Sequence, residues 1–309
     1  MIVGVFPGQG NQYMGMGQDV FENHKTARLR SKYAAKVTGI DIPRISHEGT
    51  PEEQREPVNL QLITYVHSCF MHDILKEETG LDIFCYAGHS VGEYAALYAA
   101  NSFSFADGAR IVKKRAEFMK RDIDIQRFPD GHFLVALLGA DVGEVKRLCL
   151  ESGLQVALYN SPGNIVIGGH PDLIEEWEEK MPGRPRKLGV PGPFHTKYFV
   201  NAGESLKEYL KGLDLRVPEG LVYSNYTAEP YEKDIEDPIL HMIYNLAEQL
   251  SNPVRWMQII QNMPDLELAI EMGPGKSLAG MIKKTRPEVK TLSVQDMPSL
   301  ESAVAELSS

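Results

Sequence analysis

Gly88-His89-Ser90-Val91-Gly92 decides the fold, because this stretch fits the Gly-x-Ser-x-Gly pattern of a nucleophile elbow. The apolar run over 83–87 predicts a buried strand before it, and residues 93–100 predict a helix after it. A strand, a tight turn and a helix are the context that this motif requires, which argues against a chance match in a loop. The pattern therefore predicts Ser90 as a nucleophile at the start of a helix, where backbone N–H groups are free.

A serine nucleophile needs a base, and nine histidines are available in the chain. His195 lies in a Pro/Gly loop over 192–196 that follows a predicted strand, which is a common place for a catalytic side chain. His89 is adjacent to Ser90, so we expect its ring to point elsewhere across the turn. Histidines such as His24 and His67 lie in helical or polar surroundings, where a surface or core role is expected. The residues favour His195 as the base.

The composition is that of an ordinary globular protein, with 43% hydrophobic residues in a chain of 309. This length suits one large core with a smaller inserted domain, or two domains. No segment approaches the ~18 unbroken apolar residues of a membrane helix, and the N-terminus lacks signal-peptide features. We therefore expect a cytoplasmic protein. The three cysteines show no metal-ligand spacing, so we expect free thiols and no metal site.

The net charge of −10 argues against nucleic acid as a partner. An acidic protein partner would have to dock on a local basic patch. Residues 113–114, 184–187 and 283–286 are candidates, although each could simply be a solvated face.

The order of predicted elements indicates two kinds of sheet. Strands and helices alternate up to Met119, which predicts a parallel sheet flanked by helices. From about residue 128 to residue 191 the order becomes β-α-β-β-α-β, a ferredoxin-like pattern. From Phe194 onward the chain returns to helices, with strands expected at 221–224 and 269–271.

Seven motifs in this order resemble the malonyl-CoA:acyl-carrier-protein transacylases and the acyltransferase domains of polyketide synthases. They lie at residues 6–12, 88–93, 112–119, 194–195, 223–227, 252–256 and 273–276. The resemblance extends from Phe6 to about Lys284. It implies an α/β fold, with a hydrolase-like parallel-sheet core and an inserted small ferredoxin-like α+β subdomain. We expect residues 1–127 and 193–309 to form the large catalytic subdomain, and residues 128–192 the small one.

The resemblance also implies roles for individual residues. Ser90 and His195 would be the catalytic pair, brought together by folding across 105 residues. The backbone N–H groups of Gln9 and Val91 would form the oxyanion hole. The sequence offers no clear Asp or Glu to orient the histidine, and in the family a backbone carbonyl does so. That carbonyl would belong to Gln249.

Arg115 matches the family's carboxylate-binding arginine, and a guanidinium can hold a malonyl carboxylate with two charge-assisted hydrogen bonds. Without the resemblance, an arginine on an exposed helix face would be the simpler interpretation.

Two further residues are expected at the substrate site. Phe194 resembles the residue of malonyl-selective members, because a phenyl ring beside the α-carbon would crowd an added methyl group. We also expect His89 to contact the substrate.

The implied activity is transfer of a malonyl group from CoA to the phosphopantetheine thiol of an acyl carrier protein, through an acyl-serine intermediate. Malonyl-CoA would be the donor and the carrier's phosphopantetheine arm the acceptor, in fatty-acid or polyketide biosynthesis. We expect a monomer with no permanently bound cofactor. The alternatives are an acyl hydrolase that clears stalled carriers, which would have no use for a buried Arg115, and a non-catalytic docking subunit.

The chain departs from the family pattern at two places. Asn11 replaces the more usual serine, and Arg55-Glu56-Pro57 stands where a Gln-Pro pair is usual. If Glu56 faces the cleft, its charge would oppose a malonyl carboxylate unless a nearby arginine compensates it. These departures affect the expected acyl substrate more than the reaction type.

Overall fold

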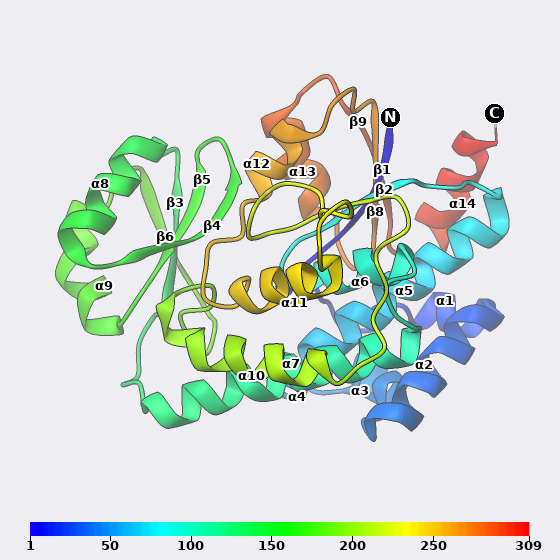
Figure 1. The fold of residues 1–309 in the computed structure, drawn as a ribbon, viewed down its shortest axis with the longest axis horizontal. Helices are drawn as coiled ribbons and strands as arrows, with labels where there is room; N and C mark the ends of the chain where they lie inside the picture. The colour runs from blue at the N-terminus through cyan, green and yellow to red at the C-terminus, as the bar shows by residue number, and fades with distance from the viewer. Residues whose placement is uncertain (309) are drawn as a thin grey trace.

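The larger part of the molecule is built on a five-stranded sheet with strand order β7-β2-β1-β8-β9, in a computed structural model that describes residues 1–308 (Figure 1). Every strand pair in this sheet is parallel. Its strands are β1 Ile2–Phe6, β2 Cys85–Gly88, β7 Leu221–Tyr223, β8 Leu268–Met272 and β9 Lys290–Val294. The helices of this part are α1 Gln18–Asn23, α2 Lys25–Thr38, α3 Ile42–Glu48, α4 Pro51–Arg55, α5 Pro57–Thr79, α6 Gly92–Ala99, α7 Phe105–Gln126, α10 Val200–Lys211, α11 Pro238–Glu248, α12 Trp256–Asn262, α13 Ser277–Thr285 and α14 Met297–Leu307.

Helices cover both faces of this sheet, which is why its central strands are continuous apolar runs. Alternate residues such as Val3 and Val5 pack against α12 and α13. Tyr86 and Ile270 belong to the opposite core, together with side chains of α5, α6 and α14. The sequence analysis missed β9, because this strand carries Lys, Thr and Ser beside apolar residues and lies at the sheet edge.

The smaller part is a four-stranded antiparallel sheet with strand order β4-β5-β3-β6. It consists of β3 Leu134–Leu138, β4 Gln155–Ser161, β5 Asn164–Gly168 and β6 Arg184–Leu188, with helices α8 Val142–Ser152 and α9 Pro171–Trp177. This β-α-β-β-α-β order is the one that the sequence predicts, so the fold class is confirmed. Figure 1 shows α8 and α9 on the outer side of this sheet. The boundaries at 127/128 and 192/193 stay a prediction.

Backbone hydrogen bonds join the two parts of the molecule. Val254 N–H donates to Ala157 O at 2.9 Å, and Tyr159 N–H donates to Val254 O at 2.9 Å. Strand β4 is therefore fixed to the segment that precedes α12.

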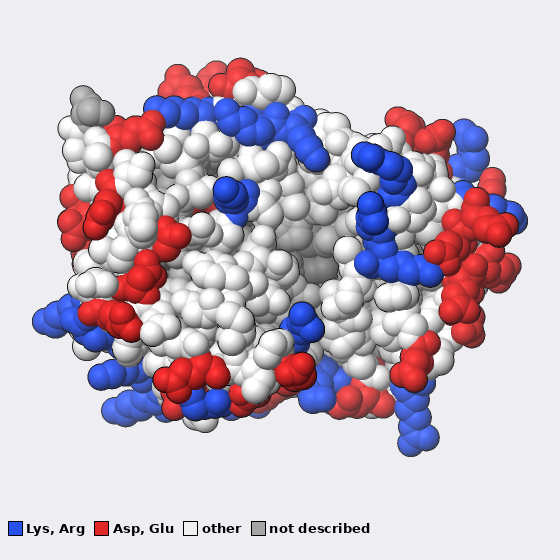
Figure 2. Space-filling model, turned by 180° about the vertical axis from the view of Figure 1, so that it is seen from behind, with Lys and Arg blue, Asp and Glu red and all other residues white. Residues whose placement is uncertain are grey.

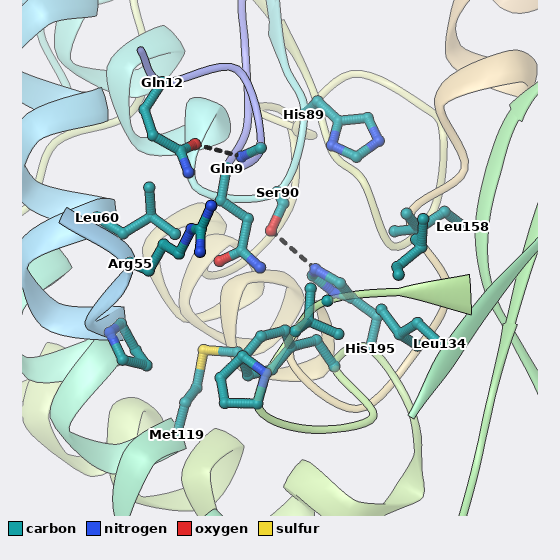
Figure 3. Close-up of a pocket in the computed structure, with 17 residues that line it drawn as sticks. Gln9, Gln12, Arg55, Leu60, His89, Ser90, Met119, Leu134, Leu158 and His195 are labelled. Carbon is teal, nitrogen blue, oxygen red and sulfur yellow. Dashed lines mark hydrogen bonds between the residues drawn. The ribbon is translucent and has the colours of Figure 1, made fainter. Parts of the chain in front are cut away.

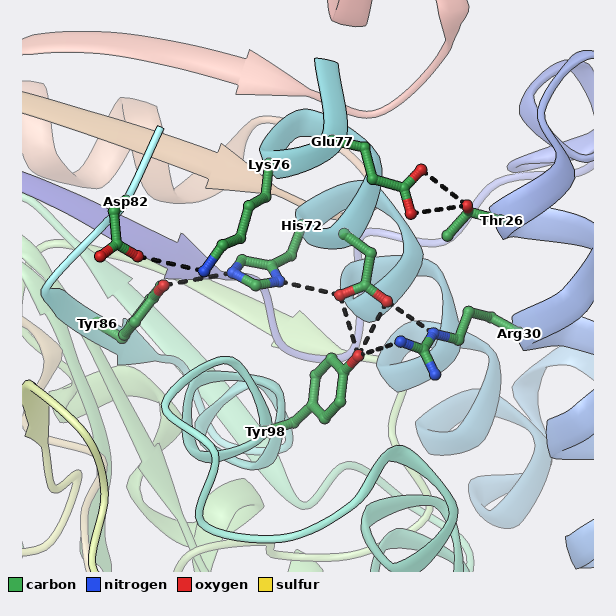
Figure 4. Close-up of polar contacts among 9 residues, drawn as sticks. Thr26, Arg30, His72, Lys76, Glu77, Asp82, Tyr86 and Tyr98 are labelled. Carbon is green, nitrogen blue, oxygen red and sulfur yellow. Dashed lines mark hydrogen bonds and ion pairs between the residues drawn. The ribbon is translucent and has the colours of Figure 1, made fainter. Parts of the chain in front are cut away.

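A partly buried polar network ties α2, α5 and α6 together (Figure 4). Arg30 Nε donates to Asp73 Oδ2 at 2.6 Å, and Arg30 Nη2 donates to Tyr98 OH at 2.7 Å. His72 lies between Asp73, at 3.2 Å, and the Tyr86 hydroxyl, at 3.3 Å. Because buried polar groups are stable only when paired, this network fixes α6 against α5.

Within residues 1–308, none of the helices combines the length and the hydropathy needed to cross a membrane.

Candidate active site

The nucleophile elbow connects β2 to α6, and Ser90 lies at its tip. Ser90 has a φ of 54°, in the left-handed region that non-glycine residues rarely occupy. A Cβ at Gly88 would lie 2.0 Å from the Gly92 carbonyl carbon, and a Cβ at Gly92 would lie 2.1 Å from Phe6 O. Both glycines are therefore required by close backbone contacts. Helix α6 begins two residues after Ser90, so the serine lies in the turn and not in the helix.

Folding brings His195 against Ser90, with Ser90 Oγ and His195 Nε2 at 2.8 Å. His195 Nδ1 lies 2.8 Å from the backbone oxygen of Gln249. A carbonyl oxygen only accepts hydrogen bonds, so Nδ1 carries the proton and Nε2 is free to accept one from the serine hydroxyl. The Gln249 carbonyl thus contacts the base, and its role in orienting His195 stays a prediction. Both Ser90 and His195 are buried.

The electrostatic surroundings keep His195 neutral. Burial and, after it, the positive charge of Arg115 lower the pKa of His195 to about 3, although the hydrogen bond to Gln249 opposes this shift. This value differs from the unperturbed histidine pKa of ~6.5 on which a sequence alone must rely.

Arg115 of α7 is a buried residue with 1% exposure, so the interpretation as a surface arginine is wrong. Its Nη2 donates to Ser90 Oγ at 3.2 Å and to Gln249 Oε1 at 3.0 Å, and its Nη1 donates to Gln61 Oε1 at 2.5 Å. A guanidinium has five N–H groups, so donors remain for an incoming anion. A cation lies directly beside the nucleophile.

The N–H groups of the elbow are mostly occupied. Ser90 N–H donates to Asn225 Oδ1 at 2.7 Å, and Gly92 N–H donates to His89 O at 2.9 Å. Among the described residues, 1–308, no acceptor contacts the N–H of Val91 or of Gln9. Two backbone donors near Ser90 are therefore available to a developing oxyanion.

A cavity of about 300 Å³ opens in front of Ser90, between the two parts of the molecule (Figure 3). The side chain of Gln9 projects into it beside Ser90 and His195 (Figure 3). The lining from the large part is Gln9, Gly10, Gln12, Arg55, Pro57, Leu60, His89, Ser90, Met119, Phe194 and His195, and that from the small part is Leu134, Leu158, Leu188, Gly189, Val190 and Pro191. A mostly apolar wall with a few polar groups at one end is typical of a small-molecule site.

His89 and Phe194 both line this cavity. The His89 ring is held away from Ser90 by a contact of 3.0 Å between its Nε2 and Asn160 Oδ1 on β4. Phe194 is 3% exposed and packs against Phe199 with the ring centres 5.2 Å apart. Their roles toward a substrate stay predictions.

Glu56 is engaged in capping a helix. Its Oε2 accepts from Val58 N–H at 2.8 Å and from Asn59 N–H at 3.0 Å, at the first turn of α5. These bonds hold the carboxylate at the helix end, where it is stabilised by the helix dipole. Arg55, not Glu56, is the charged residue that lines the cavity.

The sequence analysis assigned no role to three groups that surround the pair. Asn225 holds the elbow, because its Nδ2 donates to Gly88 O at 2.6 Å while its Oδ1 accepts from Ser90 N–H. Glu93 and the side chain of Gln249 lie behind Arg115 and are fully buried. Asn225 lies within the motif at 223–227, and Glu93 directly follows the elbow. Their positions in these motifs are the sequence feature that could have indicated a role at the site.

Across residues 1–308, no group of three or more His, Cys, Asp or Glu side chains is arranged to hold a metal ion.

The chain matches the family model described as acyl transferase domain over residues 3–304. It is 33% identical to the malonyl CoA-acyl carrier protein transacylase of Bacillus subtilis, covering 98% of this chain and 96% of the relative. The Staphylococcus aureus protein of the same name is also 33% identical, covering 95% of each chain.

Solved structures give the same result. The malonyl CoA-acyl carrier protein transacylase of Clostridium perfringens superposes with a TM-score of 0.90 at 30% identity, covering 99% of this chain and 96% of that one. A malonyl-transacylase solved in complex with a type II polyketide synthase acyl-carrier protein gives a TM-score of 0.91 at 27% identity, covering 99% of each chain. With this match over residues 3–304 and relatives at 33% identity, this chain belongs to the acyl transferase domain family.

Proposed function

We propose that this protein transfers a malonyl group from CoA to the phosphopantetheine thiol of an acyl carrier protein. The observation that carries the proposal is the buried Arg115, whose Nη2 lies 3.2 Å from Ser90 Oγ. A buried cation beside the nucleophile suits an acyl group that carries its own carboxylate. The relatives at 33% identity bear the name of this activity.

In the first half-reaction, Ser90 Oγ attacks the thioester carbonyl while His195 Nε2 takes the hydroxyl proton. The carbonyl oxygen becomes an oxyanion, for which the N–H groups of Gln9 and Val91 are the proposed donors. Collapse of the tetrahedral intermediate breaks the C–S bond, and the protonated His195 returns its proton to the CoA sulfur. The acyl group is then an ester on Ser90.

In the second half-reaction, the phosphopantetheine thiol attacks that ester and His195 accepts the thiol proton. Breaking the ester C–O bond returns the proton to Ser90 Oγ, so the cycle consumes neither water nor a redox partner. Ser90 and His195 provide the nucleophile and all the proton transfers of both half-reactions. We therefore propose that no cofactor is permanently bound.

The test of the proposal is mass spectrometry of the protein after incubation with malonyl-CoA and, separately, with acetyl-CoA. We expect a malonyl adduct on the peptide containing Ser90, and its discharge when a carrier protein with a phosphopantetheine arm is added. A protein that releases free malonate at the same rate with and without carrier would be a hydrolase, and the proposal would fail.

The low pKa of His195 predicts the pH dependence of acylation. A general base must be neutral, and a pKa lowered to about 3 leaves His195 neutral down to mildly acidic pH. We therefore expect the rate of Ser90 acylation by acetyl-CoA, measured by rapid quench, to show no acid limb near the ordinary histidine value of ~6.5. Glu93 has a pKa raised to about 7 and contacts Gln249, so only a limb that persists in a Glu93→Gln variant would show that His195 is solvated in solution.

One of the three basic clusters is placed to receive an acidic carrier. Lys113 and Lys114 share one acidic partner, Glu117, so part of their positive charge is neutralised. Arg184 and Arg186 on β6 are exposed and, among residues 1–308, have no acidic partner. Strand β6 ends at Leu188 in the cavity wall, and Lys and Arg side chains border the hollow of the molecule in Figure 2. We propose β6 as the carrier-docking edge.

Reversing these charges should weaken carrier use. We expect Arg184→Glu with Arg186→Glu to raise the KM for carrier protein on the order of tenfold at low salt, because exposed charges steer association. Transfer to free pantetheine should not change. The matched control is Lys283→Glu with Lys284→Glu on α13, which adds the same charge elsewhere. Equal effects of the two double variants would exclude docking at β6.

A further inference from the structure

We propose that Glu93 is a positioning residue for recognition of the substrate carboxylate, acting through the side-chain amide of Gln249 on Arg115. This inference rests on the malonyl-transfer function proposed above. Glu93 lies in the first turn of α6, three residues after the nucleophile, and does not line the cavity. Its carboxylate is taken up by Tyr231, Gln249 and the backbone of Asn225, so it would act through other residues.

The Glu93 carboxylate is fully buried and receives donors on both oxygens. The Tyr231 hydroxyl donates to Oε1. Gln249 Nε2 donates to Oε2 at 2.5 Å, and the N–H of Asn225 donates to the same oxygen at 3.2 Å. An ionised carboxylate only accepts hydrogen bonds, so Glu93 turns the donor end of the Gln249 amide toward itself.

Gln249 is in this way locked in one orientation. Its Nε2 donates to Ser90 O at 3.1 Å in addition to Glu93, and its Oε1 accepts from Arg115 Nη2 at 3.0 Å. In the flipped orientation, the amide oxygen would face the Glu93 carboxylate and the amide NH₂ would face the guanidinium. Both contacts would be repulsive, so the position of Glu93 determines which atom Gln249 presents to Arg115.

The same residue, through its backbone oxygen, accepts from His195 Nδ1 at 2.8 Å. Gln249 thus separates two tasks: its backbone orients the base, and its side chain orients the arginine. A change at Glu93 should disturb the second task far more than the first. This separation distinguishes a role in acyl specificity from a role in catalysis as such.

Charge compensation points the same way. Burial lowers the pKa of Arg115, and the Tyr94 ring and the charge of Glu93 are what support its protonated form. Burial also raises the pKa of Glu93 to about 7, against the hydrogen bonds of Tyr231 and Gln249. Three hydrogen-bond donors meet the Glu93 carboxylate, from Tyr231, Gln249 and the Asn225 backbone, and they support its ionised form against burial.

The experiment compares kcat/KM for malonyl-CoA and acetyl-CoA in the unmodified protein and in Glu93→Gln. The glutamine keeps the size of the side chain but can offer NH₂ to Gln249, which frees that amide to flip. We expect kcat/KM for malonyl-CoA to fall on the order of tenfold, mainly through KM, with acetyl-CoA within about threefold of the unmodified protein.

A second variant makes the assignment specific. In an Arg115→Ala background, Glu93→Gln should have no further effect on malonyl-CoA, because the residue through which it acts is absent. Tyr231→Phe, which removes one donor to Glu93, should show the same preference for malonyl loss at a smaller size. It serves as the test if Glu93→Gln does not fold.

The matched control is Glu271→Gln. Glu271 is also fully buried, with a pKa raised to about 7 by burial, but it caps α13 through the N–H groups of Leu278 and Ala279. Its substitution should leave the malonyl-to-acetyl ratio unchanged. If Glu93→Gln lowered kcat/KM equally for malonyl-CoA and acetyl-CoA, or lowered neither, the positioning role would be overturned. If the unmodified protein formed no malonyl adduct, the proposed function itself would have failed instead.

Discussion

Ser90→Ala should abolish formation of the acyl-enzyme and lower transfer on the order of 10⁴-fold or more, because the substitution removes the attacking oxygen itself. The contacts at 2.8 Å to His195 and at 3.2 Å to Arg115 would be lost with Oγ. The elbow should persist, since the hydrogen bond from the residue 90 N–H to Asn225 uses backbone atoms. Alanine meets the same left-handed φ as serine, so little further strain is added.

The measurement is the mass of the protein after incubation with malonyl-CoA, together with its melting temperature. Ser102→Ala is a suitable control, because Ser102 is another fully buried serine of the large part that does not line the cavity. It should keep full labelling. A malonyl adduct on the Ser90→Ala protein would mean that a different residue is the nucleophile.

Much of the fold and the core of the site could be predicted from the sequence, because local patterns carry them. The strand, the Gly-x-Ser-x-Gly turn and the helix around Ser90 occupy one continuous stretch, and steric contacts at Gly88 and Gly92 fix its composition. The β-α-β-β-α-β order between β3 and β6 is equally local, since each element has its own periodicity.

The remaining features depend on tertiary contacts that no local pattern reveals. Whether Glu56 opposes a substrate depends on which N–H groups its carboxylate meets, and these belong to the start of α5. The low pKa of His195 follows from its burial and from Arg115, which is 80 residues away in the chain. The side chain of Gln249 meets Glu93 across 156 residues, so its role was invisible until both were placed.

Arg115→Ala should reduce malonyl transfer selectively, which makes it the sharpest test of the proposed substrate. Removing a buried, charged hydrogen-bond partner costs roughly 2–5 kcal/mol, so kcat/KM for malonyl-CoA should fall on the order of 30-fold to several thousand-fold. Acetyl-CoA lacks the carboxylate, and its transfer should change little or increase, because no unpaired cation then remains beside Ser90. The quantity to compare is the ratio of kcat/KM for malonyl-CoA over acetyl-CoA.

Arg110→Ala provides the control on the same helix. Arg110 is exposed and pairs with Asp107 at 2.9 Å, so its loss removes a guanidinium from α7 that, unlike that of Arg115, makes no hydrogen bond to Ser90. The ratio should be unchanged in this variant, as expected for an exposed ion pair. Arg115→Ala could instead lower kcat/KM equally for malonyl-CoA and acetyl-CoA. The role of Arg115 would then be limited to its contacts with Gln61 and Gln249. Malonyl selectivity would then rest on Phe194 alone, and an acyl hydrolase that acts on uncharged chains would become the better description of this cavity.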